Sequence, residues 1–293
     1  MSPLPYIALL LVIAAVFLAL VVSALRAACP RPDARTHPLS AVVRHSTRTR
    51  ATAVLLALAA TAVTYLSGRP EGVALFGIVG LAVLLLGEHR SPAVMTPERT
   101  ASLARRRIGD YLPATGLVLL LLTVLALAAD AAVGLPVTAS DPWQAPGEPA
   151  LPTGSYFLGV STASTGEVVS GPYAPWPGPR MLVPLAVSLA IQLTAALLAL
   201  RRVTTRGQVG SRPGPLDQAL RRYLAEGTLG LILVSTALPL PLLGVPMIEA
   251  ATWEAAGWDY GRGAIGGVGI VVALVAMVYG AVLLARSPRQ VPA

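Results

Sequence analysis

The sequence predicts an all-α membrane protein, a bundle of about seven transmembrane helices in a single integral membrane domain covering residues 1–293. Hydrophobic residues make up 55% of the chain and charged residues only 12%, against about 25% charged residues in soluble domains. The apolar residues fall into runs of about 20, the length a helix needs to cross about 30 Å of hydrocarbon. The arginines gather in alternate loops. The chain lacks the ten-residue alternating pattern of a transmembrane barrel, so its spans are predicted to be helices.

A central helical hairpin fixes the predicted orientation. Its two apolar runs are Pro113 to Val133 and Met181 to Leu200, and a long loop, residues 134–180, joins them. The loop is rich in Pro, Gly, Ser, Thr and aromatic residues and has no basic residue before Arg180. Both outer ends of the hairpin lead into arginine clusters, at 105–107 and 201–202. Because basic residues favour the cytoplasmic side, the loop is predicted to lie outside.

Five further apolar runs complete the predicted set of spans. They are Tyr6 to Leu25, Ala51 to Ser67, Gly72 to Gly87, Thr228 to Val245 and Ala264 to Leu284. The first is interpreted as a retained helix, since it lacks the positively charged start of a signal peptide. The second and third are joined by a four-residue turn and so form an antiparallel hairpin. At about 17 residues each they are at the short end of the spanning range, which leaves open whether they cross fully.

The charge distribution supports this topology. The predicted inner loops are residues 26–50, 88–112 and 201–227. These loops and the C-terminal tail contain 19 of the 22 arginines, and the outer loops contain the other three, Arg69, Arg180 and Arg262. The amino terminus is therefore predicted outside and the carboxyl terminus inside. All basic residues are arginine, a composition typical of a high-GC bacterial genome. The expected location is a bacterial plasma membrane, crossed several times.

The third inner loop is predicted to contain an amphipathic helix. Leu216, Leu220, Tyr223 and Leu224 share one face at helical spacing, with arginine on the other. Such a helix is expected to lie in the headgroup region with its apolar face towards the hydrocarbon. The formal charge of +8 is accordingly assigned to the membrane, with anionic lipid headgroups as partners of the inner loops, and not to nucleic acid.

The residue inventory argues against several kinds of chemistry. The absence of lysine excludes a retinal Schiff base. A single cysteine, Cys29, excludes an internal disulfide and a multi-cysteine metal site. The three histidines lie in inner loops without metal-ligand spacing. No paired carboxylate or GxSxG motif is present. The sequence therefore predicts no catalytic residue, no cofactor and no metal, and the protein is not expected to be an enzyme.

Two polar residues within the spans are candidate ligand contacts. Asp130 lies about one turn from the outer end of its span, where a solvated interface residue is expected, although ionisable residues within membranes are often functional. Gln192 lies near mid-helix, where an interhelical hydrogen bond is the expected role and substrate contact the alternative. Pro239 and Pro241 remove two backbone donors and predict a break near the outer end of their span.

The outer loop supplies the remaining candidates, Tyr173, Trp176 and Arg180. Two stretches, Tyr156 to Val160 and Glu167 to Val169, have strand-forming residues and predict a small hairpin capped by GPYAPWPGP. Trp176 is expected at the membrane interface. Long ordered loops often carry function, so this loop is interpreted either as a docking site for a protein or ligand or as a linker with aromatic anchors.

Two short motifs carry a resemblance. The run GPYAPWPGPR just before a helix, with arginine-rich segments such as ALRRYL, resembles uncharacterised polytopic membrane proteins of actinobacteria. The resemblance implies a multi-pass helical fold and brings no activity or catalytic residue with it.

Three functions follow as hypotheses. The first is a non-enzymatic accessory or sensing component of a membrane complex, whose outer loop meets a protein partner or ligand. The alternative is a transporter or exporter of an apolar or weakly polar solute, along a path past Gln192 and the break at Pro239 and Pro241. The second alternative, an intramembrane enzyme, requires Asp130 and Glu226 to face one shared cavity.

Overall fold

The computed structural model describes residues 40–67, 70–90, 107–134, 155–157, 160–162, 168–170, 173–175, 179–205, 215–252 and 260–286. The predicted first span, Tyr6 to Leu25, lies outside these residues. The α-helices within them are α2 (Ser40–Leu66), α3 (Ala74–His89), α4 (Ala114–Gly134), α5 (Pro179–Thr205), α6 (Pro215–Ala237), α7 (Pro239–Thr252) and α8 (Tyr260–Ala285). Short 3-10 helices, η2 (Pro70–Val73) and η3 (Ile108–Tyr111), precede α3 and α4.

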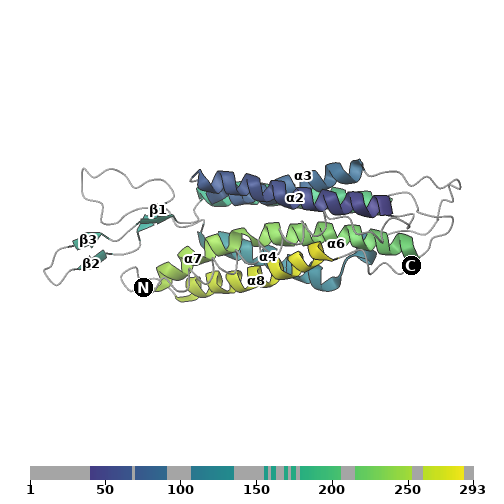
Figure 1. Cartoon of the computed structure of the whole chain (residues 1–293). Coiled ribbons are helices and arrows are strands. Elements are labelled where there is room, and N and C mark those ends of the chain that lie inside the picture. The colour runs from purple at the N-terminus through teal and green to yellow at the C-terminus, as the bar shows by residue number, and fades with distance from the viewer. Residues whose placement is uncertain are drawn as a thin grey trace.

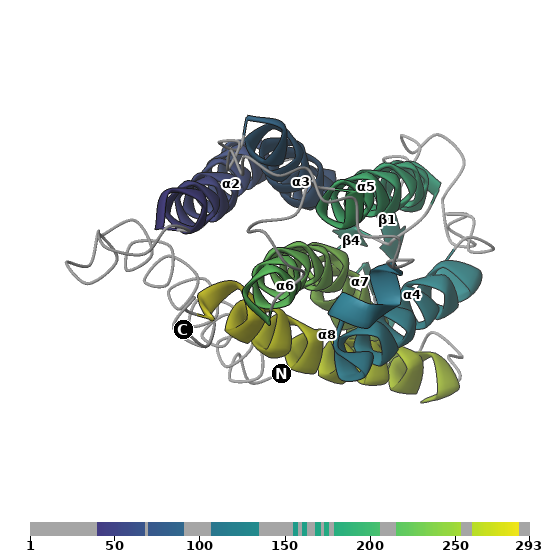
Figure 2. The ribbon, with the colours of Figure 1, turned by 90° about the vertical axis from the view of Figure 1, so that its right-hand side faces the viewer.

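Helix α6 forms the centre of the bundle. Seen end-on, α2, α3 and α5 make an arc along one side of α6, while α4 and α8 cover the other (Figure 2). Helix α7 continues the direction of α6 and packs along α8 (Figure 1). Of the 18 most apolar consecutive residues in Asp217–Val245, 89% are buried, compared with 17% for the corresponding stretch of Ala114–Val133 in α4. A helix that is apolar on all sides is thus enclosed by the others.

Four helical segments are long and apolar enough to cross a membrane: Ala114–Val133, Leu182–Thr205, Asp217–Val245 and Gly263–Ala285. Helix α3 is a shorter apolar helix, and α2 carries an uncharged stretch from Ala51 to Leu66. The outward faces of α4, α5 and α8 expose leucine, valine and isoleucine, as in Leu121, Ile191 and Val275. Apolar faces this extensive match the hydrocarbon of a bilayer. The chain is a helical, multi-pass integral membrane protein, which agrees with the class predicted from the sequence.

Glycine pairs bring α8 against α6 and α7. A Cβ atom on Gly230 would lie 2.7 Å from the carbonyl oxygen of Gly280, and one on Gly280 would lie 2.7 Å from the oxygen of Gly230. Gly244 and Gly266 face each other in the same way further along the helices. Small residues at these contacts let two backbones approach closely, which is how helices associate where lipid removes the hydrophobic driving force.

The ends of several helices meet at one end of the bundle. Val42 of α2, Val203 of α5, and Leu220 and Leu224 of α6 form a separate apolar cluster there. The His45 Nε2 atom lies 2.8 Å from the carbonyl oxygen of Gly87 in α3, and Arg286, just after α8, bonds to α6. The segments adjoining these ends belong to the loops predicted to be inner, so we call this the arginine end of the bundle.

Two predicted inner loops are partly helical, which corrects the predicted boundaries. Residues 40–50, placed in the loop 26–50, form the first three turns of α2. Residues 215–227, placed in the loop 201–227, are the start of α6, which runs unbroken into the predicted span. The predicted interfacial helix is therefore wrong, because Leu220, Tyr223 and Leu224 pack against α2 and α5 and not against headgroups.

The strands of the outer loop pair differently from the predicted hairpin. Strand β1 (Ser155–Phe157) pairs with β4 (Tyr173–Pro175), which places Tyr156 opposite Ala174. Strand β2 (Val160–Thr162) pairs with β3 (Val168–Ser170). The segment predicted as a cap thus supplies the partner of the first strand. Beyond the end of the helical bundle, β1, β2 and β3 lie on the side away from the arginine end (Figure 1).

Candidate functional site

Gln192 lies inside the bundle where α3, α5 and α6 meet, and it is only 3% exposed. Its amide nitrogen donates to the Ala74 carbonyl oxygen at 3.2 Å and to Ser188 Oγ at 2.7 Å. Its amide oxygen accepts from Ser235 Oγ at 2.8 Å. Ser188 Oγ also donates to the Ala74 carbonyl oxygen, at 3.0 Å. Each polar atom of the Gln192 side chain thus has a partner, and the group joins three helices.

Gly77 creates the space for this amide. A Cβ atom at Gly77 would overlap the side-chain amide carbon, oxygen and nitrogen of Gln192. The amide therefore lies directly on the backbone of α3. This arrangement has the geometry of a packing contact, in agreement with the expected role of Gln192 as an interhelical hydrogen-bonding residue.

The proline break lies between α6 and α7. Helix α6 ends at Ala237, Leu238 forms a turn, and α7 begins at Pro239. In a continuous helix, residues 239 and 241 would donate to the carbonyls of Ser235 and Ala237, and proline has no N–H to do so. Pro239 instead occupies the first position of a new helix, where its missing donor costs least. The break predicted from these prolines is confirmed, although it lies near the middle of the predicted span and not at its outer end.

Asp130 of α4 is fully buried, with 0% of its surface exposed. A Cβ atom built on Gly269 of α8 would lie 3.4 Å from its Oδ2 atom, 3.7 Å from its Oδ1 atom and 3.5 Å from Leu240 Cδ2 of α7. The carboxyl group therefore lies where α4, α7 and α8 meet. Leu240, the α7 residue at this site, directly follows Pro239. Neither oxygen has a hydrogen-bond partner among the residues that the structure describes. The expectation of a solvated interface residue is wrong, because neighbouring helices enclose the side chain.

Glu226 lies far from Asp130. It accepts hydrogen bonds from Arg222 Nε at 3.1 Å and from Arg286 Nη1 at 2.9 Å, both to its Oε1 atom. Arg286, just after α8, is separated from Gly269 of that helix by about 25 Å at about 1.5 Å per residue. The two carboxyl groups hence do not share a cavity, and the geometry expected for the intramembrane enzyme is not found.

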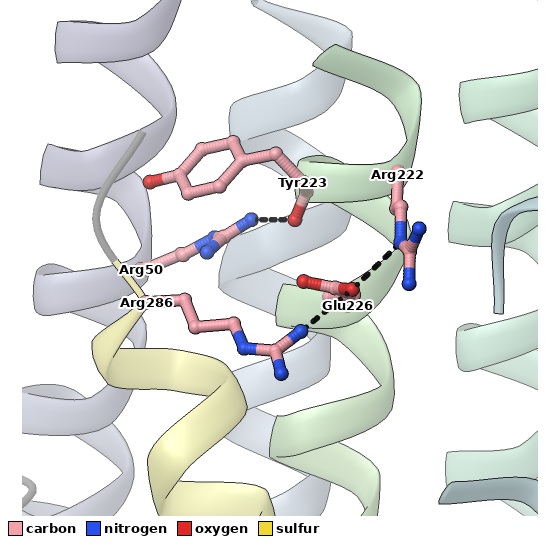
Figure 3. A network of polar contacts seen from close by, with 5 residues as sticks. All are labelled: Arg50, Arg222, Tyr223, Glu226 and Arg286. Atoms are coloured by element: carbon pink, nitrogen blue, oxygen red, sulfur yellow. Dashed lines mark hydrogen bonds and ion pairs between the residues drawn. The ribbon is translucent and has the colours of Figure 1, made fainter. Parts of the chain in front are cut away.

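The ion pairs of Glu226 belong to a polar network at the arginine end (Figure 3). Arg50 of α2 donates to the Tyr223 carbonyl oxygen, and its guanidinium lies over the Tyr223 ring, 3.7 Å from the ring centroid. The Tyr223 hydroxyl lies 3.0 Å from Thr47 Oγ1 of α2. The cation–π contact and the hydrogen bond offset part of the cost of burying Arg50, whose Nη1 atom has no hydrogen-bond partner among the described residues. The network ties α2 and α8 to α6.

Arg221, also on α6, contacts α5 and caps its C-terminal end. Its Nη1 donates to the carbonyl oxygens of Val203 and Thr204, the latter at 3.0 Å, and its Nε donates to Asp217 Oδ2 at 2.9 Å. The last carbonyls of a helix lack intrahelical donors and carry partial negative charge, so a buried cation is stabilised there. Arg221 is 1% exposed and has a structural role.

The outer-loop candidates are only partly described. Tyr173 lies in β4 opposite Phe157, and Arg180 lies in the first turn of α5. Trp176 lies outside the described residues. On α5, Arg180 is separated from Gln192 by about 18 Å at about 1.5 Å per residue.

Sequence reasoning missed Arg50, Arg221 and Tyr223 as interior residues. The basic run that ends at Arg50 predicts a loop there, and the helical pattern predicts Arg221 on a polar helix face. The spacing of Asp217 and Arg221, four residues apart, was the visible pattern, since oppositely charged residues at that spacing pair on a helix.

Comparison with known proteins adds no relative. No protein-family model, curated protein or solved structure matches this chain. Within the described part of the chain, no group of three or more His, Cys, Asp and Glu side chains is placed to hold a metal ion.

Proposed function

We propose that the protein is a non-enzymatic accessory or sensing component of a bacterial membrane complex, with its amino terminus outside, seven spans and its carboxyl terminus inside. The observation that carries this proposal is the filled interior around α6. Gln192, the residue best placed to line a transport path, uses its amide to bond α3, α5 and α6 together. The same central helix is tied to α2 and α8 at the arginine end. A bundle fixed at both places favours a scaffold.

Two surfaces of this scaffold are proposed to meet partners. Arg48, Arg201 and Arg202 are exposed near the arginine end, where they are suited to anionic lipid headgroups, each worth about 1 kcal/mol near such a surface. At the other end, the outer loop 134–180 is proposed to dock a protein, with Tyr173, Trp176 and Arg180 as contacts. Aromatic residues and arginine are the residue types that dominate binding at protein interfaces.

Alanine substitution across Tyr173 to Arg180 tests the docking site, with membrane insertion and co-purifying proteins measured together. The expected result is loss of a specific partner with insertion unchanged. The matched control replaces Val160 to Thr162 in β2, a segment of the same loop, and is expected to retain the partner. If the wild-type protein co-purifies with no specific partner under several extraction conditions, the accessory function is rejected.

Labelling of Cys29, the only cysteine, tests the proposed orientation in the wild-type protein. A membrane-impermeant maleimide is expected to leave Cys29 unmodified in intact cells and to modify it after permeabilisation. A Ser140→Cys variant on a Cys29→Ser background is expected to react in intact cells. The reverse pattern overturns the proposed orientation.

The transporter remains a second candidate, and the Asp130 site is the observation that favours it. A buried carboxyl group beside a helix break resembles the arrangement in transporters, where substrate and ion sites occur at interrupted helices near the middle of the membrane. The test compares export or tolerance of apolar compounds in cells carrying wild-type protein, Gln192→Ala and Pro239→Ala. Unchanged phenotypes in both variants eliminate this candidate.

A further inference from the structure

We propose that Asp130 is an exchangeable proton-binding site within the membrane. This inference goes beyond the accessory function and holds equally for a transporter, since it concerns only the state of one carboxyl group. It rests on the location of the side chain, on the chemistry of its neighbours and on the helix break beside it.

The location favours a neutral carboxyl group. Asp130 lies in the candidate span Ala114–Val133 and is 0% exposed. Burying an ionised carboxylate without a partner costs many kcal/mol, so such a group takes up a proton instead. No described side chain donates to either oxygen. The proton supplies the neutralisation that elsewhere in this chain comes from arginine, as at Glu226 and Asp217.

On α4, α7 and α8, the three helices that meet at Asp130, the charged and titratable groups lie at a distance along the helix. Tyr279 of α8 contacts the position of Gly116, about 21 Å along α4 from Asp130 at about 1.5 Å per residue. Glu226 and the arginines around it lie at the arginine end. On α7, Glu249 lies about 14 Å of helix beyond Leu240. On α8, Arg262 lies about 10 Å of helix before Gly269.

The neighbours of the carboxyl group favour a proton over a metal cation. Apart from the backbone of α8 around Gly269, the described atoms nearest to a Cβ atom built on Gly269 are the two Asp130 carboxyl oxygens and an apolar carbon of Leu240. Hard cations such as Mg²⁺ and Ca²⁺ need about six or more oxygen ligands. A proton needs only the carboxyl group itself.

The break between α6 and α7 gives the proton a place to exchange. Leu240, which contacts the site, is the second residue of α7 and follows the turn at Leu238. The carbonyls of Ser235 and Ala237 lack their usual helical donors, because residues 239 and 241 are prolines. The Leu238 N–H still donates to the Val234 carbonyl oxygen at 3.0 Å, so the interruption is confined to the proline positions. A small shift at this turn, which moves Leu240, is the movement through which we infer that the proton exchanges.

Infrared difference spectroscopy tests the site on the full-length protein in lipid vesicles. Wild-type protein minus Asp130→Asn is expected to show the carbonyl stretch of a protonated carboxyl group at neutral pH. In D₂O the band is expected to shift, and at alkaline pH it is expected to weaken. Glu226→Gln is the matched control, since Glu226 is ion-paired, and its difference spectrum is expected to lack the band at neutral pH.

Three results would overturn the proposal. One is absence of the band from the wild-type minus Asp130→Asn spectrum at neutral pH, which means that the carboxyl group is ionised. Another is a band that neither shifts in D₂O nor changes with pH, which makes Asp130 a static neutral group. The third is loss of the band on adding Na⁺ at constant pH and ionic strength, which makes it a cation site. None of these measurements depends on a partner protein or on transport.

Discussion

The arginine end of the bundle and the region of the proline break treat buried polar groups in opposite ways. At the arginine end, Arg221 has a carboxylate and two carbonyls, and Glu226 has two arginines. At the break, Asp130 is more deeply buried than either and has no partner among the described side chains. At the arginine end, Arg50 Nη1 is the only buried atom of the described charged side chains that lacks a hydrogen-bond partner, whereas at Asp130 both carboxyl oxygens lack one.

Gln192 lies between these two regions and sharpens the contrast. It is uncharged, 3% exposed, and fully paired. A group with partners stabilises the fold, whereas an unpaired buried group lowers its stability. The predictions below therefore differ in sign between the two regions, and all are measured as unfolding in mixed detergent and SDS micelles, followed by circular dichroism.

The largest effect is expected for Arg221→Ala. It removes the partner of buried Asp217 and leaves the Val203 and Thr204 carbonyls without their donor, and breaking a buried pair in this way costs about 3–5 kcal/mol. Arg222 is the adjacent control, because its side chain is 62% exposed and surface pairs contribute under about 1 kcal/mol. Equal losses in Arg221→Ala and Arg222→Ala would contradict the assignment of Arg221 as a buried helix cap.

Gln192→Ala is expected to cost about 2–3 kcal/mol, since it removes packing volume together with three hydrogen bonds. Thr194→Ala is the control, because Thr194 is exposed on the same helix and bonds only to the Ala190 carbonyl of its own helix. If the two variants unfold alike, Gln192 does not join the helices.

Gly77→Ala sharpens the same point through a double-mutant cycle. Alone it is expected to cost about 1–3 kcal/mol, because the new methyl group overlaps the Gln192 amide. On the Gln192→Ala background the methyl group enters vacated space, so the cost is expected to fall. Additive costs would show that the two residues do not contact each other.

The helical membrane class was predictable because apolar run length is a local property of the sequence. Pro239 and Pro241 also marked their break correctly, since a missing backbone donor acts at the residue itself. The helix boundaries at the arginine end were wrong for a physical reason. Arginine in a basic run reads as solvated, and only the folded chain reveals that Arg50 rests on Tyr223 and that Arg221 meets the end of α5.

The candidate site was predictable in its residues and not in its environment. Asp130 and Gln192 stood out as polar residues within apolar runs. Whether each is solvated, paired or isolated depends on which helix faces it. The Gln192 amide packs against Gly77 and the Asp130 carboxyl group against Gly269, and these contacts are visible only in the folded chain. Without long-range contacts, a carboxyl group one turn from a helix end is most simply interpreted as solvated, which proved wrong.

The smallest effect, and the one of opposite sign, is expected for Asp130→Val. Replacing an unpaired buried polar group by an apolar side chain of similar size removes its desolvation cost, so stability is expected to rise by about 1 kcal/mol. Asp130→Asn keeps the size and leaves an unpaired amide, so it serves as the control without a gain. A loss of stability in Asp130→Val comparable to that in Gln192→Ala would mean that the carboxyl group is paired and that the two regions do not differ. A gain in stability means instead that Asp130 weakens the fold of the wild-type protein. This is expected of a residue kept for function, because functional sites are often less stable than the fold would allow.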